Sequence, residues 1–293
     1  MKDYLVRGTV KNRAIRVMAC KTTDLVEVAR QKHDLWPTSS AALGRMMSAT
    51  LMMGSMLKDN EKLTVVINGG GPIGTMLCVT QGDGRIRGFV GDPHCMFTNN
   101  RTGKLDVGYA VGTQGYLQVV RDMGLKEPFT SQIPLQTGEI GDDFTAYYAY
   151  SEQTPSAVSL GVLVGVENEI LASGGFMVQM LPEATDEDVA YVEEALKDFP
   201  AVSSLIHEGS SPEDILRKLF RDVEILGSQD LCFECPCSKA SFEAGLMTLG
   251  KQELLDMIAK DHGCEVTCQF CNTKYQFSET DLLQLVADME KSS

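Results

Sequence analysis

The chain carries two short cysteine-rich segments near its end, Cys232-Phe-Glu-Cys235-Pro-Cys237 and Cys264-Glu-Val-Thr-Cys268-Gln-Phe-Cys271. They hold six of the nine cysteines within the last 62 residues. Thiol pairs that folding brings together can bind one soft metal ion in a tetrahedron. The same thiols can close into local disulfides when they are oxidised. The segments therefore indicate a structural metal clamp, a redox sensor, or both.

The spacing of these cysteines narrows the kind of metal site. Thirty residues separate Cys237 from Cys268, which is longer than the spacer of about 15–20 residues in a zinc ribbon. Only four of the six thiols can bind one tetrahedral ion, and His262 is the only histidine beside them. We therefore expect an all-sulfur site, which selects Zn²⁺ or an iron–sulfur cluster.

Two roles for such a site stay open at this point. A module of about 60 residues buries too little apolar surface to be stable alone, so a metal would supply folding free energy in a purely structural site. A disulfide across the single residue Pro236 would be strained, and strained disulfides are the labile ones. Thiolates bound to zinc also remain nucleophilic where they are accessible. The strain of a disulfide across Pro236 and the nucleophilicity of zinc-bound thiolates both favour a redox switch.

Outward from the cysteines, the chain predicts an α+β protein with three parts. Residues 1–180 read as an N-terminal α/β core domain, with helices at 23–33, 39–57 and 142–152. Runs of strand character joined by short turns, such as Asp83-Gly84, imply a mostly antiparallel sheet packed with these helices. The expected strands are Leu63–Ile67, Ile73–Thr80, Arg85–Val90, Gly115–Val120, Val158–Val164 and Ile170–Met180.

Residues 181–227 read as a helical linker. Thr185 is placed to cap one amphipathic helix, and Ser211 followed by Pro212 is placed to begin another. Two short helices surrounded by loops need something to dock on, because isolated helices of this length are marginal in water.

Residues 228–293 read as a small C-terminal zinc-binding module. Its helices are expected at 239–248 and 251–261, with Gly250 and Gly263 as their C-caps, and a last helix follows Ser278. The module carries 11 acidic residues against five lysines. This balance does not suit a nucleic-acid ribbon, which needs a positive field.

The net charge of −14 argues more generally against nucleic acid or an anionic membrane as a partner. We find neither a secretory signal nor an apolar stretch of transmembrane length, so a cytoplasmic location is the expectation. In that compartment clustered cysteines serve as metal or redox sites rather than as structural disulfides.

A glycine-rich segment, Gly69-Gly-Gly-Pro-Ile-Gly74, fits the letters of a dinucleotide-binding motif and follows a strand. Such a motif requires a helix to begin there, with its N-terminus facing the pyrophosphate. A strand is expected to follow instead, so we interpret the segment as a turn.

The remaining sulfur-containing residues and the pair His94-Cys95 have plain interpretations. Five methionines crowd the helix at 39–57, as core residues or as a flexible surface for client proteins. Cys20, Cys78 and Cys95 are expected to be buried small hydrophobes. We expect no catalytic pair at His94-Cys95, because neighbouring side chains of an extended chain point apart.

The cysteine pattern is similar to that of a known family. Together with the Tyr275-Gln-Phe277 that follows them, Cys235-Pro-Cys237-Ser238 and Glu265-Val-Thr-Cys268-Gln-Phe-Cys271 resemble the zinc centre of the 33 kDa chaperonin family, the redox-regulated heat-shock holdases. The resemblance extends over the whole chain, including Leu249-Gly250 and the segment Trp36-Pro-Thr-Ser-Ser-Ala-Ala-Leu-Gly44. It implies that the zinc ligands are Cys235, Cys237, Cys268 and Cys271.

The resemblance also implies how the protein works. The reduced zinc form is inactive or weakly active, and oxidants release zinc while Cys235–Cys237 and Cys268–Cys271 disulfides form. The C-terminal module then unfolds, the linker loosens, and the exposed surface binds unfolding client proteins without ATP. The oxidised form tends to be a homodimer, and the protein is not an enzyme. Cys232 and Cys264 depart from the pattern; we expect spare thiols, although they could trap other disulfides.

A second hypothesis is a zinc-containing regulatory or nucleic-acid module fused to an enzyme-like α/β domain. Basic patches near the cysteines would favour it, and the sequence has none there.

Overall fold

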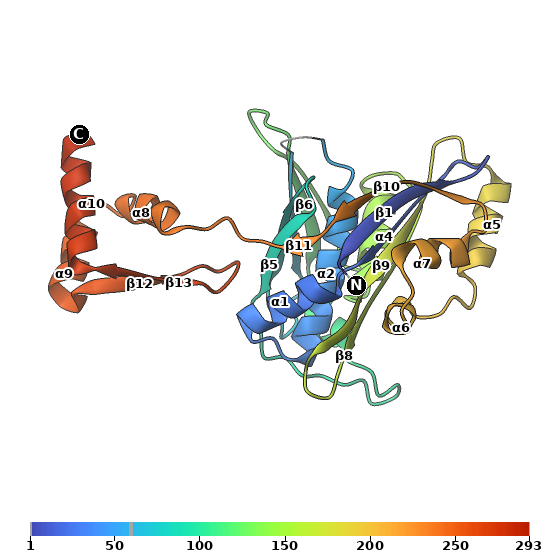
Figure 1. Cartoon of the computed structure of the whole chain (residues 1–293), viewed down its shortest axis with the longest axis horizontal. Helices are drawn as coiled ribbons and strands as arrows, with labels where there is room; N and C mark the ends of the chain where they lie inside the picture. The colour runs from blue at the N-terminus through green and yellow to red at the C-terminus, as the bar shows by residue number, and fades with distance from the viewer. Residues whose placement is uncertain (1, 59–60, 293) are drawn as a thin grey trace. The chain divides into compact units, whose positions relative to one another are not determined.

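The computed structural model describes residues 2–58 and 61–292. The chain divides into two compact units, which we call the N-terminal unit (Met1–Glu234) and the C-terminal unit (Cys235–Ser293). In Figure 1 the first runs from blue to orange and the second from orange to red. Both sheets of the N-terminal unit are antiparallel almost throughout, so the expected α+β class is confirmed. The division of the chain at residues 180 and 227 stays a prediction.

One sheet of the N-terminal unit has five strands in the order β10-β1-β2-β9-β8, and all neighbours are antiparallel. Its strands are β1 (Tyr4–Val10), β2 (Ile15–Lys21), β8 (Ser156–Val164), β9 (Ile170–Met180) and β10 (Val223–Asp230). Side chains alternate between its two faces, so that Leu5 and its neighbour Val6 join different apolar clusters.

A second sheet has six strands in the order β11-β5-β4-β3-β6-β7. Its strands are β3 (Lys62–Asn68), β4 (Met76–Gln81), β5 (Arg85–Val90), β6 (Tyr116–Asp122), β7 (Phe129–Pro134) and β11 (Cys232–Phe233). The short edge strand β11 pairs in parallel with β5, and the other neighbours are antiparallel. Gly84, with a φ of 82°, makes the predicted β4–β5 hairpin turn.

Helix α2 (Pro37–Gly54) lies between the two sheets and is buried almost throughout (Figure 1). Its methionines are core residues, since Met46, Met47, Met52 and Met53 are at most 1% exposed. Helices α1 (Thr23–His33), α3 (Val107–Val111) and α4 (Gly141–Tyr150) complete this core. The helix predicted at 39–57 begins earlier because Pro37 occupies the first helical position.

Three helices cover the other face of the five-stranded sheet (Figure 1): α5 (Asp186–Leu196), α6 (Val202–His207) and α7 (Pro212–Leu219). Thr185 caps α5 and Ser211 caps α7, as predicted, and the structure adds that each cap is part of a capping box. Helix α6 was not expected, because the sequence predicted only two short helices in this segment, with loops around them. The sheet is the surface on which these short helices dock.

The C-terminal unit has a small apolar core of its own, formed by Leu246, Leu254, Phe277, Leu282, Leu285 and Val286. Its elements are α8 (Lys239–Met247), α9 (Lys251–Asp261), β12 (Gly263–Thr267), β13 (Lys274–Ser278) and α10 (Glu279–Ser292). The expected C-caps are wrong, because Thr248 ends α8, Gly250 precedes α9 and the left-handed His262 ends α9. The β12–β13 hairpin was not predicted.

The glycine-rich segment is a turn, as interpreted. The Gly74 N–H donates to the Gly71 carbonyl at 3.1 Å, and Gly70 and Gly74 have φ values of 72° and 70°. Strand β4 follows, so no helix begins where a pyrophosphate would need one. Across residues 2–58 and 61–292, none of the helices has the length and apolar character needed to span a bilayer.

Candidate metal centre

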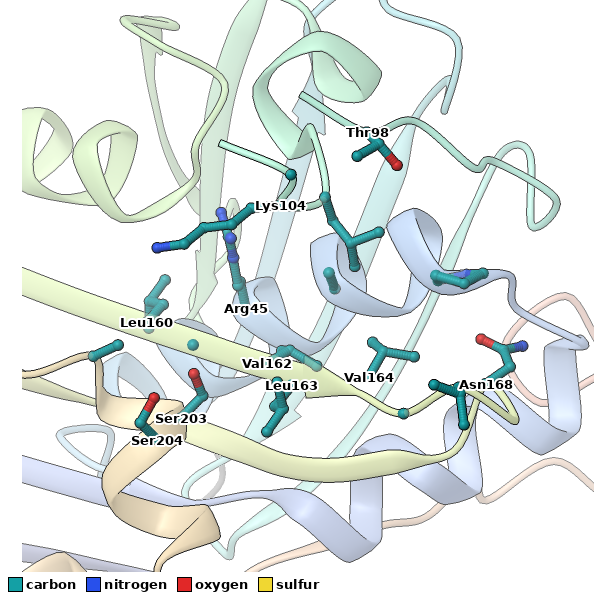
Figure 2. A pocket seen from close by; sticks show the side chains of 18 of the residues that line it. Arg45, Thr98, Lys104, Leu160, Val162, Leu163, Val164, Asn168, Ser203 and Ser204 are labelled. Carbon is teal, nitrogen blue, oxygen red and sulfur yellow. The ribbon is translucent and has the colours of Figure 1, made fainter. Parts of the chain in front are cut away.

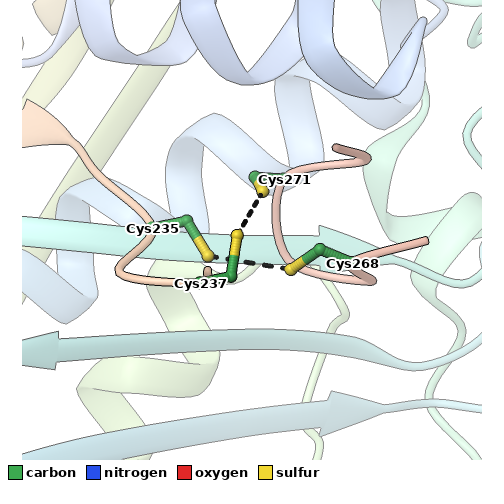
Figure 3. A group of neighbouring side chains, drawn as sticks. All are labelled: Cys235, Cys237, Cys268 and Cys271. Atoms are coloured by element: carbon green, nitrogen blue, oxygen red, sulfur yellow. Dashed lines mark hydrogen bonds between the residues drawn. The ribbon is translucent and has the colours of Figure 1, made fainter. Parts of the chain in front are cut away.

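Four cysteines meet within the C-terminal unit. Cys235 and Cys237 lie in the extended segment before α8, and Cys268 and Cys271 lie in the turn between β12 and β13. Their four sulfur atoms all lie within 4.8 Å of one another, and Figure 3 shows the side chains converging from the two segments. The structure thus brings together the four residues that the family resemblance implies as ligands.

The spacing of the sulfurs suits one tetrahedral ion. Cys235 Sγ lies 3.7 Å from Cys268 Sγ, and Cys237 Sγ lies 3.4 Å from Cys271 Sγ (Figure 3). Four sulfurs at about 2.3 Å from a central zinc stand about 3.8 Å apart. The group could therefore hold a metal ion with small adjustments of the side chains.

Local hydrogen bonds shape the turn that carries Cys268 and Cys271. The Cys268 N–H donates to the Thr273 carbonyl at 2.9 Å, and the Cys268 carbonyl accepts from Asn272 at 2.7 Å and from Cys271 at 3.3 Å. Asn272 has a φ of 56°, a left-handed conformation that asparagine tolerates. This tight turn places both thiols on the same side of the hairpin end.

Polar neighbours contact two of the sulfurs. The hydroxyl oxygen of Tyr275, on β13, lies 3.2 Å from Cys237 Sγ and donates to the Cys237 carbonyl at 3.1 Å. Cys271 Sγ donates to Thr273 Oγ1 at 3.2 Å. The sequence pattern includes Tyr275, but it does not predict the contact with Cys237, because the two residues lie 38 positions apart.

The thiols differ in how readily they ionise. Burial raises the pKa of Cys268 to about 12 and also raises the pKa of Cys237. At Cys271 the effect of burial is outweighed by hydrogen bonds with Thr273 and the neighbouring thiols, which lower the pKa to about 7. Four thiolates this close together repel one another, so a cation is required to hold the whole group ionised.

The two additional cysteines lie outside this group. Cys232 is exposed on β11 in the N-terminal unit. Cys264 lies on β12, opposite Phe277, and packs against the apolar core of the C-terminal unit. The described four-cysteine group includes neither of them.

The other three cysteines were expected to be buried small hydrophobes, and His94-Cys95 was expected to form no catalytic pair. Cys20, Cys78 and Cys95 are at most 3% exposed, as predicted. His94 Nε2 lies 3.0 Å from Asp34, whereas the Cys95 thiol donates to the Asp92 carbonyl at 3.7 Å. The side chains of His94 and Cys95 therefore have separate partners.

A pocket of about 690 Å³ in the N-terminal unit bears on the enzyme hypothesis. Figure 2 shows it between α2, β8, α6 and the segment that holds Thr98 and Lys104. Apolar side chains of β8 form much of its wall, and Arg45 and Lys104 supply positive charge. Among the described residues that line it there is no His, Cys, Asp or Glu, so the lining offers no general base of these types.

Comparisons with known proteins agree with one another. The model of the Hsp33 protein family matches residues 3–278. The 33 kDa chaperonin of Staphylococcus epidermidis is 49% identical over 98% of this chain and 99% of its own, and that of Bacillus subtilis is 47% identical over 96% and 97%. The crystal structure of the 33 kDa chaperonin of Thermotoga maritima superposes with a TM-score of 0.91 at 35% identity, covering 99% of this chain and all of that one.

Proposed function

Because the chain belongs to the Hsp33 family of chaperones, we propose that it is an ATP-independent holdase that oxidation switches on. The observation that carries the proposal is the group of four sulfurs from two distant segments, all within 4.8 Å. Reduced, this group would hold a metal and keep the C-terminal unit folded. When the group is oxidised, its sulfurs would be joined in disulfides and could no longer bind the metal.

We propose zinc as the metal, held by Cys235, Cys237, Cys268 and Cys271. The donor set is four soft thiolates, and the sulfur spacing suits one ion rather than a cluster of several irons, which holds its ligands further apart. When bound, zinc would supply positive charge for the thiolates and a cross-link between the two segments. The residues themselves supply the redox chemistry.

In the proposed switch, Cys235 pairs with Cys237 and Cys268 pairs with Cys271. Each pair gives two electrons to one hydrogen peroxide, two protons complete the two water molecules that form, and one S–S bond results. The within-segment pairing comes from the family resemblance. The sulfurs of Cys235 and Cys268, and those of Cys237 and Cys271, also lie close to each other.

Loss of the C-terminal fold would then reach the N-terminal unit through the chain. Strand β11 has only two residues, and Glu234 alone separates it from Cys235. The Cys232 N–H donates to the Gly84 carbonyl and the Glu234 N–H to the Ile86 carbonyl, which holds this short segment beside β5. Residues 181–227 would act as the linker that loosens, and the apolar faces of α5–α7 would become available. The proposed partners are unfolding client proteins and, in the oxidised state, a second copy of the chain, in the cytoplasm.

The first test follows aggregation of a thermally unfolding client by light scattering. Peroxide-treated protein is expected to suppress scattering at stoichiometric amounts without ATP, whereas the reduced zinc form is not. Equal suppression by both forms would overturn the switch. A mass map of the same oxidised sample tests the pairing separately, because a Cys232–Cys235 disulfide would contradict it and leave the chaperone activity intact.

A second prediction concerns Tyr275, whose hydroxyl contacts the Cys237 sulfur. The hydrogen bond with Cys237 raises the pKa of Tyr275 to about 12, so the hydroxyl stays protonated. Its single proton can be donated either to the Cys237 carbonyl or to the Cys237 thiolate. Tyr275→Phe is expected to weaken zinc binding about tenfold, the usual effect of losing a hydrogen bond to a ligand. Competition with a chelator measures it, and the exposed Tyr109→Phe is the control. Equal zinc affinity in both variants would contradict the prediction.

A further inference from the structure

Three buried polar atoms that lack hydrogen-bond partners lie around one small cavity of the N-terminal unit. Within the described residues, Tyr148 Oη, Gln179 Oε1 and Arg121 Nε have no such partner, and all three residues line a cavity of about 230 Å³. Tyr148 and Gln179 are each only 2% exposed. Buried polar groups are nearly always hydrogen-bonded, so three exceptions at one place indicate that ordered water or a bound molecule completes them.

The cavity lies where the two sheets meet. Arg16 comes from β2 and Gln179 from β9 of the five-stranded sheet, Arg121 comes from β6 of the six-stranded sheet, and Tyr148 comes from α4. Met53, at the end of α2, is among the apolar residues of the wall. Arg16 is exposed, so a molecule can enter from its side.

The groups around the cavity define what it can bind. The Tyr148 hydroxyl and Arg121 Nε are donors in need of an acceptor. The guanidinium of Arg16 donates one hydrogen bond, to the Met56 sulfur at 3.5 Å. Burial raises the pKa of Tyr148, so its hydroxyl remains a donor at neutral pH. Gln179 Oε1 is an acceptor in need of a donor.

Two carboxylates also line the cavity, and both have partners. Glu152 accepts from Arg121 at 2.9 Å and from Tyr147 at 2.7 Å, and Glu61 accepts from the backbone of Lys58 at 3.1 Å. The negative charges of Glu61 and Glu152 disfavour a doubly negative ligand whose polar atoms are all hydrogen-bond acceptors. They are compatible with an anion that keeps a proton.

We propose that this cavity binds a small oxyanion bearing an O–H group, the chemistry of hydrogen phosphate. Its oxygens would accept from Arg16, Arg121 and Tyr148, and its O–H would donate to Gln179. The volume is below that of drug-sized ligand sites, which begin at about 300 Å³, and it suits one such ion with a few waters. Sulfate has no proton at neutral pH and would leave Gln179 unsatisfied.

Calorimetry of the reduced full-length protein with inorganic phosphate, sulfate or glycerol phosphate, at matched ionic strength, tests the proposal. Phosphate is expected to bind about tenfold more tightly than sulfate, because an unsatisfied buried acceptor has a cost of that order. Gln179→Met is expected to abolish this preference. The phosphoryl group of glycerol phosphate is largely unprotonated at neutral pH. Tighter binding of phosphate than of glycerol phosphate would therefore support the proposal, and equal binding of the two would contradict the role given to the O–H group.

Neighbouring tyrosines of α4 give a matched pair of variants. Tyr148→Phe removes a hydroxyl without a partner, so it is expected to leave the unfolding temperature of the ligand-free protein unchanged or higher and to weaken phosphate binding about tenfold. Tyr147→Phe removes a hydroxyl that bonds Ser131 and Glu152, so it should lower that temperature and keep phosphate binding. Equal binding of phosphate and sulfate would overturn the proposal, as would phosphate binding that Tyr148→Phe and Gln179→Met leave intact. A Tyr148→Phe protein that is less stable without ligand and unresponsive to phosphate would indicate that only water fills the cavity.

Discussion

Removal of the metal is expected to unfold the C-terminal unit and leave the N-terminal unit folded. The apolar core of the C-terminal unit has six buried side chains among its described residues, which is too little for a domain of this size to be stable alone. A structural zinc site supplies apparent binding energies of about 10–16 kcal/mol in small peptides. The group of four cysteines joins the segment before α8 to the β12–β13 turn, so its loss disconnects the unit.

Hydrogen exchange followed by mass spectrometry measures this effect. After chelation the amides of β12, β13 and α9 should exchange rapidly, while those of α2 and β3 keep their protection. Cys268→Ser should behave like the chelated protein. Cys264→Ser is the matched control, because Cys264 lies on the same hairpin and outside the four-cysteine group. Unchanged protection of β12 and β13 after chelation would contradict the prediction.

The second large effect is expected from Asp3→Ala, at about 3–5 kcal/mol of the free energy of unfolding of the N-terminal unit. Asp3 is 2% exposed and accepts from Lys21 Nζ at 3.1 Å and from the Leu25 N–H, in the first turn of α1, at 2.7 Å. Asp3 caps the N-terminus of α1 from outside the helix, because the side chain of the N-cap residue Thr22 makes no capping hydrogen bond. Burial raises the pKa of Asp3, while the Leu25 hydrogen bond and the Lys21 charge oppose that rise.

Chemical denaturation of the full-length chain measures this cost. Asp3→Asn keeps an acceptor for the Leu25 N–H and should lose less than Asp3→Ala, because the helix cap survives while the charge facing Lys21 does not. The double variant Asp3→Ala, Lys21→Met should recover part of the loss, because apolar replacements for a buried ion pair are often tolerated. A loss below about 1 kcal/mol in Asp3→Ala would show that the buried carboxylate contributes little.

The sequence predicted those features whose signals are local. Residue type and spacing were sufficient to indicate an all-sulfur metal site, because thiol chemistry is carried by the residues themselves. The family resemblance then singled out Cys235, Cys237, Cys268 and Cys271, whose sulfurs the structure places together. The beginnings of α5 and α7 were predicted from Thr185, Ser211 and Pro212, since a cap satisfies backbone groups within one turn. The helix at 23–33 was predicted with its observed bounds.

The features that we did not predict depend on distant partners. Strand β1 lies between β2 and β10. The residues of β10 are more than 200 positions away from β1, and nothing in the short apolar runs of β1 identifies β10 as its neighbour. Strand β10 likewise follows three helices, so we included its first residues in a helical segment. The sequence predicted one sheet where the N-terminal unit has two, because a strand's own residues do not reveal which other strands it shares hydrogen bonds with.

The geometry of the four sulfurs has a consequence for the topology of the chain. The contacts from Cys235 to Cys268 and from Cys237 to Cys271 join residues 33 and 34 positions apart, so a shared metal closes one long loop. Closing a loop of that length removes about 4 kcal/mol of conformational entropy from the unfolded chain. Disulfides within each segment would close only very short rings. Oxidation would therefore exchange one long-range restraint for two local ones, and it would free the intervening chain without removing a single covalent bond of the backbone.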